Sequence, residues 1–165
     1  MASTITSSSL KVKISEEIEL NGKSQGGEIE HTVSTNINEI YKRRMTITDT
    51  EVAIINTGTV AGGTFPAADI RYMRISNLSS STASHIILRL IDGSTTSETA
   101  LKLVAGASIL FYGDTTTTAA AQGVLKYFDA EDGAISTIAL GDILQIKADC
   151  STSAGQDIEI FIASV

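Results

Sequence analysis

The best candidate for a metal site is Asp129-Ala130-Glu131-Asp132-Gly133, where three acidic side chains precede a glycine. Carboxylate oxygens are ligands that Ca²⁺ prefers, and the glycine would let the chain turn. The segment lacks the glutamate at the twelfth position of an EF-hand loop and the helices that flank such a loop. We therefore interpret it as a solvated turn, and calcium binding by Asp129, Glu131 and Asp132 is the less favoured alternative.

Few other side chains could act as a nucleophile, a general base or a zinc ligand. The chain has two histidines, His31 and His85, and one cysteine, Cys150. A catalytic histidine needs an oriented partner within hydrogen-bond reach, and no Gly-x-Ser-x-Gly motif surrounds any serine. No spacing of His and Cys suits a zinc site. We expect structural histidines, and we expect no enzyme, no catalytic residue, no metal and no cofactor.

The only run of basic residues is Lys42-Arg43-Arg44. Three charges are too few to indicate a nucleic-acid surface. The favoured interpretation is a solvated strand face. The alternative is a contact with an acidic partner surface, such as that of a neighbouring subunit. In that case Lys42, Arg43 and Arg44 are the candidate subunit-contact residues.

The 165 residues carry a net charge of −7, which argues against an electrostatic grip on nucleic acid or an anionic membrane. No apolar run approaches the roughly 20 residues that span a bilayer. Residues 113–165 account for −6 of the charge, with Lys126 and Lys147 set against eight acids: Asp114, Asp129, Glu131, Asp132, Asp142, Asp149, Asp157 and Glu159. These acids could form one face toward a basic partner, but solvent-facing loops are the favoured interpretation.

Apolar side chains alternate with polar ones over residues 10–20, which predicts a half-buried strand. Asn21-Gly22 follows and favours a tight turn with positive φ. A second alternating run begins near Glu28 and continues to Ile37. We therefore predict an N-terminal hairpin or arm over residues 1–38, with residues 21–27 as its flexible connection.

Residues 39–165 contain many short alternating or apolar segments and almost no helical pattern. The predicted strands cover 41–49, 51–56, 69–78, 85–92, 98–104, 108–112, 123–128, 135–140, 142–149 and 156–163. Short strands at such regular spacing are typical of an all-β sandwich or barrel. We predict a single antiparallel β-sandwich, jelly-roll-like domain over 39–165, with which the N-terminal hairpin could also merge. The Thr/Ala-rich tract at 114–122 could be loop or helix, although its threonines disfavour a helix.

Four stretches together resemble small virion structural proteins of marine tailed phages: MTITDTEVAII (45–55), IRYMRISNLSSSTASHIILRL (70–90), LKLVAGASILFYG (101–113) and DIEIFIAS (157–164). The resemblance covers most of residues 41–165, but the tract at 114–122 departs from it. It implies a non-enzymatic virion protein, and the expected role is a capsid decoration (cement) protein. The expected partners are the major capsid protein and copies of this chain, as a trimer by analogy. The implied location is the virion, assembled in the host cytoplasm.

Two other functions remain open. A tail or neck adaptor or a fibre-attachment protein would share the same architecture and would differ in copy number per particle. A carbohydrate-binding module for host recognition usually presents exposed aromatic side chains, whereas this chain has 5% aromatic residues and no tryptophan.

Overall fold

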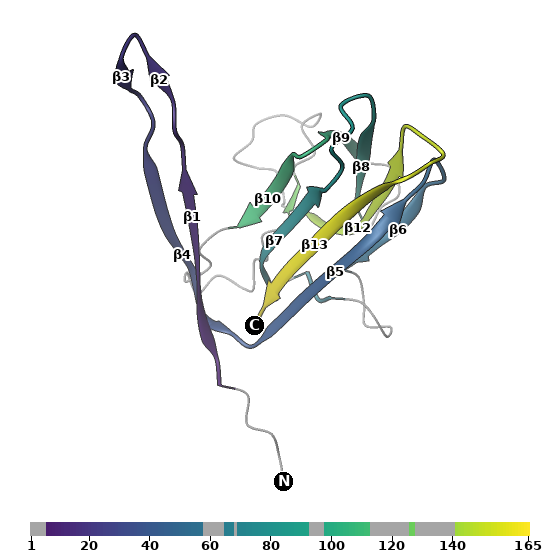
Figure 1. Cartoon of the computed structure of the whole chain (residues 1–165). Helices are drawn as coiled ribbons and strands as arrows, with labels where there is room; N and C mark the ends of the chain where they lie inside the picture. The colour runs from purple at the N-terminus through teal and green to yellow at the C-terminus, as the bar shows by residue number, and fades with distance from the viewer. Residues whose placement is uncertain (1–5, 58–64, 68, 93–97, 113–125, 128–140) are drawn as a thin grey trace, which may run out of the picture.

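In the computed structural model of this chain, all regular structure is β-sheet within the residues that the structure describes, which are 6–57, 65–67, 69–92, 98–112, 126–127 and 141–165. Two antiparallel sheets pack face to face, and an N-terminal hairpin stands against one of them (Figure 1). The predicted fold class, an antiparallel β-sandwich with an N-terminal hairpin, is confirmed. No helix in these residues is long and apolar enough to cross a membrane.

The first sheet has four strands in the order β10-β7-β13-β5, all antiparallel to their neighbours. Their bounds are β5 (Glu39–Ile47), β7 (Ile70–Asn77), β10 (Ser108–Tyr112) and β13 (Gln156–Ser164). In β13 the alternation of the sequence places Ile158, Ile160 and Ile162 on the inner face, where each is fully buried. The residues between them lie on the outer face of this sheet.

The second sheet is built around β12, which pairs with β8 along one edge and with β6 and β11 along the other. β9 continues the sheet beyond β8. The bounds are β6 (Val52–Asn56), β8 (His85–Asp92), β9 (Glu98–Val104), β11 (Lys126–Tyr127) and β12 (Gly141–Cys150). Of the predicted strands, 135–140 lies outside the described residues, 123–128 is described only at β11, and the tract at 114–122 also lies outside them.

The main core lies between the two sheets and consists largely of branched aliphatic side chains. Its fully buried members include Ile47, Met73, Ile75, Ile86, Leu88, Ile146, Ile158, Ile160 and Ile162. A polar group lies at its margin, where Asn77 Nδ2 donates to Leu103 O at 3.1 Å and to Gln156 Oε1 at 3.0 Å. These bonds satisfy a buried amide that would otherwise destabilise the fold.

The N-terminal hairpin is made of β1 (Ser8–Ser15) and β4 (Glu28–Ile37), and it ends in the short strands β2 (Glu19–Leu20) and β3 (Lys23–Ser24). Asn21 has φ 53° and Gly22 has φ 72°, so the predicted tight turn with positive φ is confirmed. The strand predicted over 10–20 is instead interrupted after Ser15. Residues 21–27 are not a simple connection, because Gln25 N donates to Ile18 O at 2.9 Å and extends the pairing toward the tip.

Candidate functional site

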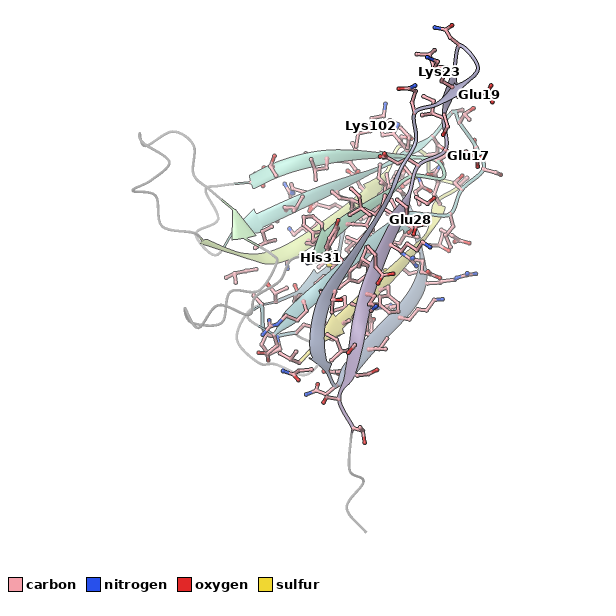
Figure 2. The ribbon with its side chains drawn as sticks, turned by 90° about the vertical axis from the view of Figure 1, so that its left-hand side faces the viewer. Glu17, Glu19, Lys23, Glu28, His31 and Lys102 are labelled. Carbon is pink, nitrogen blue, oxygen red and sulfur yellow. The ribbon has the colours of Figure 1, made fainter. Side chains whose placement is uncertain are left out.

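The hairpin packs by its base on the outer face of the first sheet, as the two views show (Figures 1 and 2). Val12, Val33 and Ile37 from the hairpin form a buried cluster with Tyr72 of β7 and Ala163 of β13. The half-buried side chains that surround this cluster are Leu10, Tyr112, Phe161 and Val165. The outer face of the sheet is therefore a second, smaller core, and this core holds the hairpin in place.

A groove of about 380 Å³ runs beside this cluster, between β1 and the first sheet. Its apolar lining consists of Leu10, Val12, Tyr72, Leu110 and Phe161. Its charged lining is entirely cationic and consists of Lys11, Lys13, Lys42 and Arg74. We call this feature the cationic groove. Apolar surface combined with positive charge suits a ligand or segment that carries both apolar groups and carboxylates.

Next to the groove, Glu159 forms ion pairs with three cationic side chains on the outer face of the sheet. Arg74 Nη2 lies 2.6 Å from Glu159 Oε1, while Arg44 Nε and Lys42 Nζ lie 3.1 Å and 3.3 Å from Oε2. The strand register brings them together, because Glu159 pairs with Arg44 on β5 and with Ser76 on β7. One carboxylate faces three cations, so the cluster keeps an excess of positive charge.

The electrostatics of this cluster favour the ionised carboxylate. The hydrogen bond from Arg44 is the largest cause that lowers the pKa of Glu159, and Lys42 and Arg74 lower it further. Desolvation of the carboxylate, whose side chain is 7% exposed, opposes this shift without reversing it. Arg74 Nε is buried and has no hydrogen-bond partner among the described residues. The guanidinium of Arg74 also lies 5.9 Å from the ring centre of Phe161.

The basic run Lys42-Arg43-Arg44 is divided between the two faces of β5. Lys42 and Arg44 lie on the outer face with Glu159, whereas Arg43 has the opposite parity and is exposed. Lys42 and Arg44 thus have a partner within the chain, although their side chains remain 56% and 70% exposed. A role in subunit contact stays a prediction for all three residues.

A second ionic cluster lies on the outer face of the second sheet. Glu51 accepts a hydrogen bond from Arg89 and lies 3.2 Å from Lys147, and Arg89 also lies 3.4 Å from Glu98. Desolvation acts to raise the pKa of Glu51, but the hydrogen bonds from Lys147 and Arg89 outweigh it and lower that pKa. These charges balance one another, so the cluster is explained by stabilisation of the sheet.

The acidic face considered from the sequence does not form among the acids whose side chains are described. Asp149 lies on the outer face of the second sheet near Lys147, whereas Asp157 and Glu159 lie on the outer face of the first. Asp157 accepts a hydrogen bond from Thr46 at 2.6 Å, and Glu159 is held by its three cations. All three acids lie on strands, so the favoured interpretation, solvent-facing loops, is wrong for them.

The other candidates from the sequence lie apart from one another. The ring of His31 stands 5.9 Å from that of Tyr112, and His85 begins β8 on the second sheet. Cys150 is buried and ends β12, with Sγ 3.8 Å from Thr152 Oγ1. No three His, Cys, Asp or Glu side chains gather as a metal site in the described part of the chain. The calcium candidates Asp129, Glu131 and Asp132 lie outside it.

Sequence reasoning considered Glu159 only as one of eight acids of a possible acidic face, and it missed Arg74. Glu159 has the pattern of a solvent-facing residue, because it alternates with the buried isoleucines of β13. The one signal available was the excess of basic over acidic residues at the outer positions of β5, and that signal does not identify the partner.

No family model matches the chain, and no curated protein matches it. Among solved structures, a chain from a study titled "Bacillus endospore appendages form a novel family of disulfide-linked pili" aligns with 100% of this chain and 98% of its own length, at 9% identity and a TM-score of 0.40. A TM-score of 0.40 is too low to support an inference about this chain.

Proposed function

We propose that this chain is a non-enzymatic structural subunit of a phage virion and that it decorates and stabilises the capsid exterior. The observation that supports an assembly role is the projecting half of the hairpin. Ile14, Ile18, Leu20 and Ile29 are 37%, 56%, 60% and 66% exposed. Ile14 and Ile29 are direct cross-strand partners and share the face that carries Val12 into the buried cluster. An apolar face therefore continues from the packed base to the exposed pair Ile14 and Ile29, and Ile18 and Leu20 add exposed apolar side chains nearer the free end.

Such a face is unfavourable in water, because exposed apolar area costs about 25 cal/mol per Å² relative to burial. Contiguous apolar patches on soluble domains commonly mark protein contacts. A two-stranded hairpin is also marginally stable by itself. A neighbouring protein surface that covers the hairpin would bury the exposed apolar area and would stabilise the two strands. Such burial against a neighbour is expected of a particle subunit.

The virion role in particular rests on the four resembling stretches. They coincide with strands of the sandwich: the end of β5 with β6, β7 with β8, β9 with β10, and β13. The resemblance therefore concerns the scaffold and its turns. Its strands include Tyr72, Arg74, Leu110 and Phe161 of the cationic groove, whereas the lysines of the groove lie outside the resembling stretches. The major capsid protein and further copies of this chain are the partners that this proposal requires.

The proposal is tested by imaging purified particles of the phage that encodes the chain and by melting particles that lack it. We expect many copies on the capsid exterior and a lower melting temperature of heads without the chain. A small ring of copies at the neck or tail would instead support the adaptor role. Absence from the particle, or unchanged melting of heads that lack it, would overturn the decoration role.

A further inference from the structure

We propose that the hairpin tip of one copy, residues 16–24, docks in the cationic groove of a second copy, so that the chain associates head to tail. This interaction is a property of the isolated protein. It therefore goes beyond the virion role and does not depend on it.

The hairpin tip combines the two properties that the groove would select. Glu17 and Glu19 alternate with the exposed apolar side chains of Ile18 and Leu20, and Glu16 precedes them. The three carboxylates form no ion pair with any residue in the described ranges, in contrast to Glu28 and Glu30 nearer the base, which pair with Lys13 and Lys11. Figure 2 shows Glu17, Glu19 and Lys23 toward the free end of the hairpin.

The cationic groove offers the complementary chemistry. Lys42 and Arg74 share the single carboxylate of Glu159 with Arg44, and this excess of cations makes them attractive to further carboxylates. Lys11 and Lys13 also line the groove, and each is paired with one glutamate of β4. The side chain of Arg74 is 36% exposed, so part of its guanidinium is accessible to a carboxylate from another copy. Leu110 of the groove is 38% exposed and provides apolar area for an isoleucine or leucine.

The geometry makes the occupant a different copy. Leu10, Val12 and the two lysines of the groove belong to β1, which leads directly into the tip. The tip therefore cannot turn back into its own groove without breaking the hairpin. From Val12 to Asn21 an extended chain reaches about 30 Å at about 3.3 Å per residue. That reach is close to the diameter of about 35 Å expected for a domain of this size, so an adjacent copy would present its groove to the tip.

A tip of one copy in a groove of the next is a heterologous contact, which closes into a ring or continues as a chain. Sedimentation velocity of the purified full chain over a range of concentrations tests it. We expect concentration-dependent oligomers for the natural sequence. A chain that stays monomeric at several hundred micromolar would overturn the inference. If that monomer still bound phage heads, the decoration role would stand on its own.

Charge-altered variants test the two surfaces separately. Glu17→Lys with Glu19→Lys should weaken association at least tenfold. The groove variant exchanges the charges within both cross-strand ion pairs by four substitutions: Lys11→Glu, Glu30→Lys, Lys13→Glu and Glu28→Lys. It should weaken association similarly, while the hairpin keeps its ion pairs. Mixing the tip variant with the groove variant should restore association in part. Undiminished association of both variants, with unchanged unfolding midpoints, would overturn the inference.

Matched controls separate docking from general effects of charge or hydrophobicity. Lys102→Glu alters an exposed lysine on β9 of the other sheet and should leave association unchanged. Ile18→Ser with Leu20→Ser should weaken association, whereas Val104→Ser, at a position of similar exposure on β9, should not. Equal losses for Val104→Ser and the tip variant would show non-specific apolar association and would also overturn the inference.

Discussion

Arg74 and Glu159 lie 85 positions apart in the chain, yet Arg74 Nη2 donates to Glu159 Oε1 over 2.6 Å on the outer face of the first sheet. This ion pair joins the two central strands of that sheet, β7 and β13, and it lies beside the cationic groove. The same carboxylate also holds Arg44 and Lys42 of β5. Glu159 therefore connects three of the four strands through their side chains.

Replacing Glu159 by glutamine should destabilise the fold. The substitution keeps the shape but leaves Lys42, Arg44 and Arg74 close together without a counter-charge, so their mutual repulsion is no longer offset. We expect a lower urea midpoint for Glu159→Gln. The control is Glu98→Gln, which removes a more exposed partner of Arg89 at 3.4 Å and should shift the midpoint less. An equal or smaller shift for Glu159→Gln would contradict the role of this cluster.

The same carboxylate should make stability depend on pH in the acid range. The pKa of Glu159 is lower in the folded chain than the ordinary glutamate value of about 4.3. Its contribution is therefore complete above that ordinary value and is lost as the pH falls through the folded pKa. Urea midpoints measured from pH 7 down to pH 3 should fall less steeply below about pH 4.5 in Glu159→Gln than in the natural chain. Parallel curves for the two proteins would refute this prediction.

Shortening a side chain in the hairpin cluster should loosen the hairpin before the sandwich. Val33 is 1% exposed and packs between the hairpin and the first sheet. Val33→Ala should cost about 1–3 kcal/mol, from lost burial and a residual cavity. Hydrogen exchange should accelerate in β1 and β4 while amides of β13 stay protected. Ile29→Ala, at a position that is 66% exposed, is the control and should leave exchange in both regions unchanged.

Gly155 should tolerate no side chain in the turn between β12 and β13. Its φ is +77°, and an added Cβ would lie 2.8 Å from Thr46 Cγ2 and 3.0 Å from Ile47 O. Gly155→Ala should therefore cost the left-handed backbone penalty of roughly 1–2 kcal/mol and a steric term in addition. Gly106→Ala is the matched control, because Gly106 has φ +73° and nothing within 4 Å of an added Cβ. Equal losses of unfolding free energy for the two variants would show that the close approach to β5 is unimportant.

The sequence by itself determined the β class, the N-terminal hairpin and most of the strands. Alternation of apolar and polar residues is a local property, since successive side chains on a strand point to opposite faces. That is why Ile158, Ile160 and Ile162 could be assigned to a buried face, and why Asn21-Gly22 predicted a turn with positive φ. Prediction was weaker where the local pattern was interrupted, as after Ser15, because strand ends depend on the pairing partner.

Only the tertiary structure decided what the outer faces do. Alternation assigns Glu159 to the side away from the main core, but it cannot show that three cations surround this carboxylate. The pattern of β7 does not alternate cleanly, and only the structure shows that the hairpin covers Tyr72. Glu159 and Arg44 are 115 positions apart and meet because β13 pairs with β5 in one particular register. Strand order and register arise from long-range pairing, and a shift of one residue would move every side chain to the opposite face. The site therefore depends on contacts that no local pattern contains.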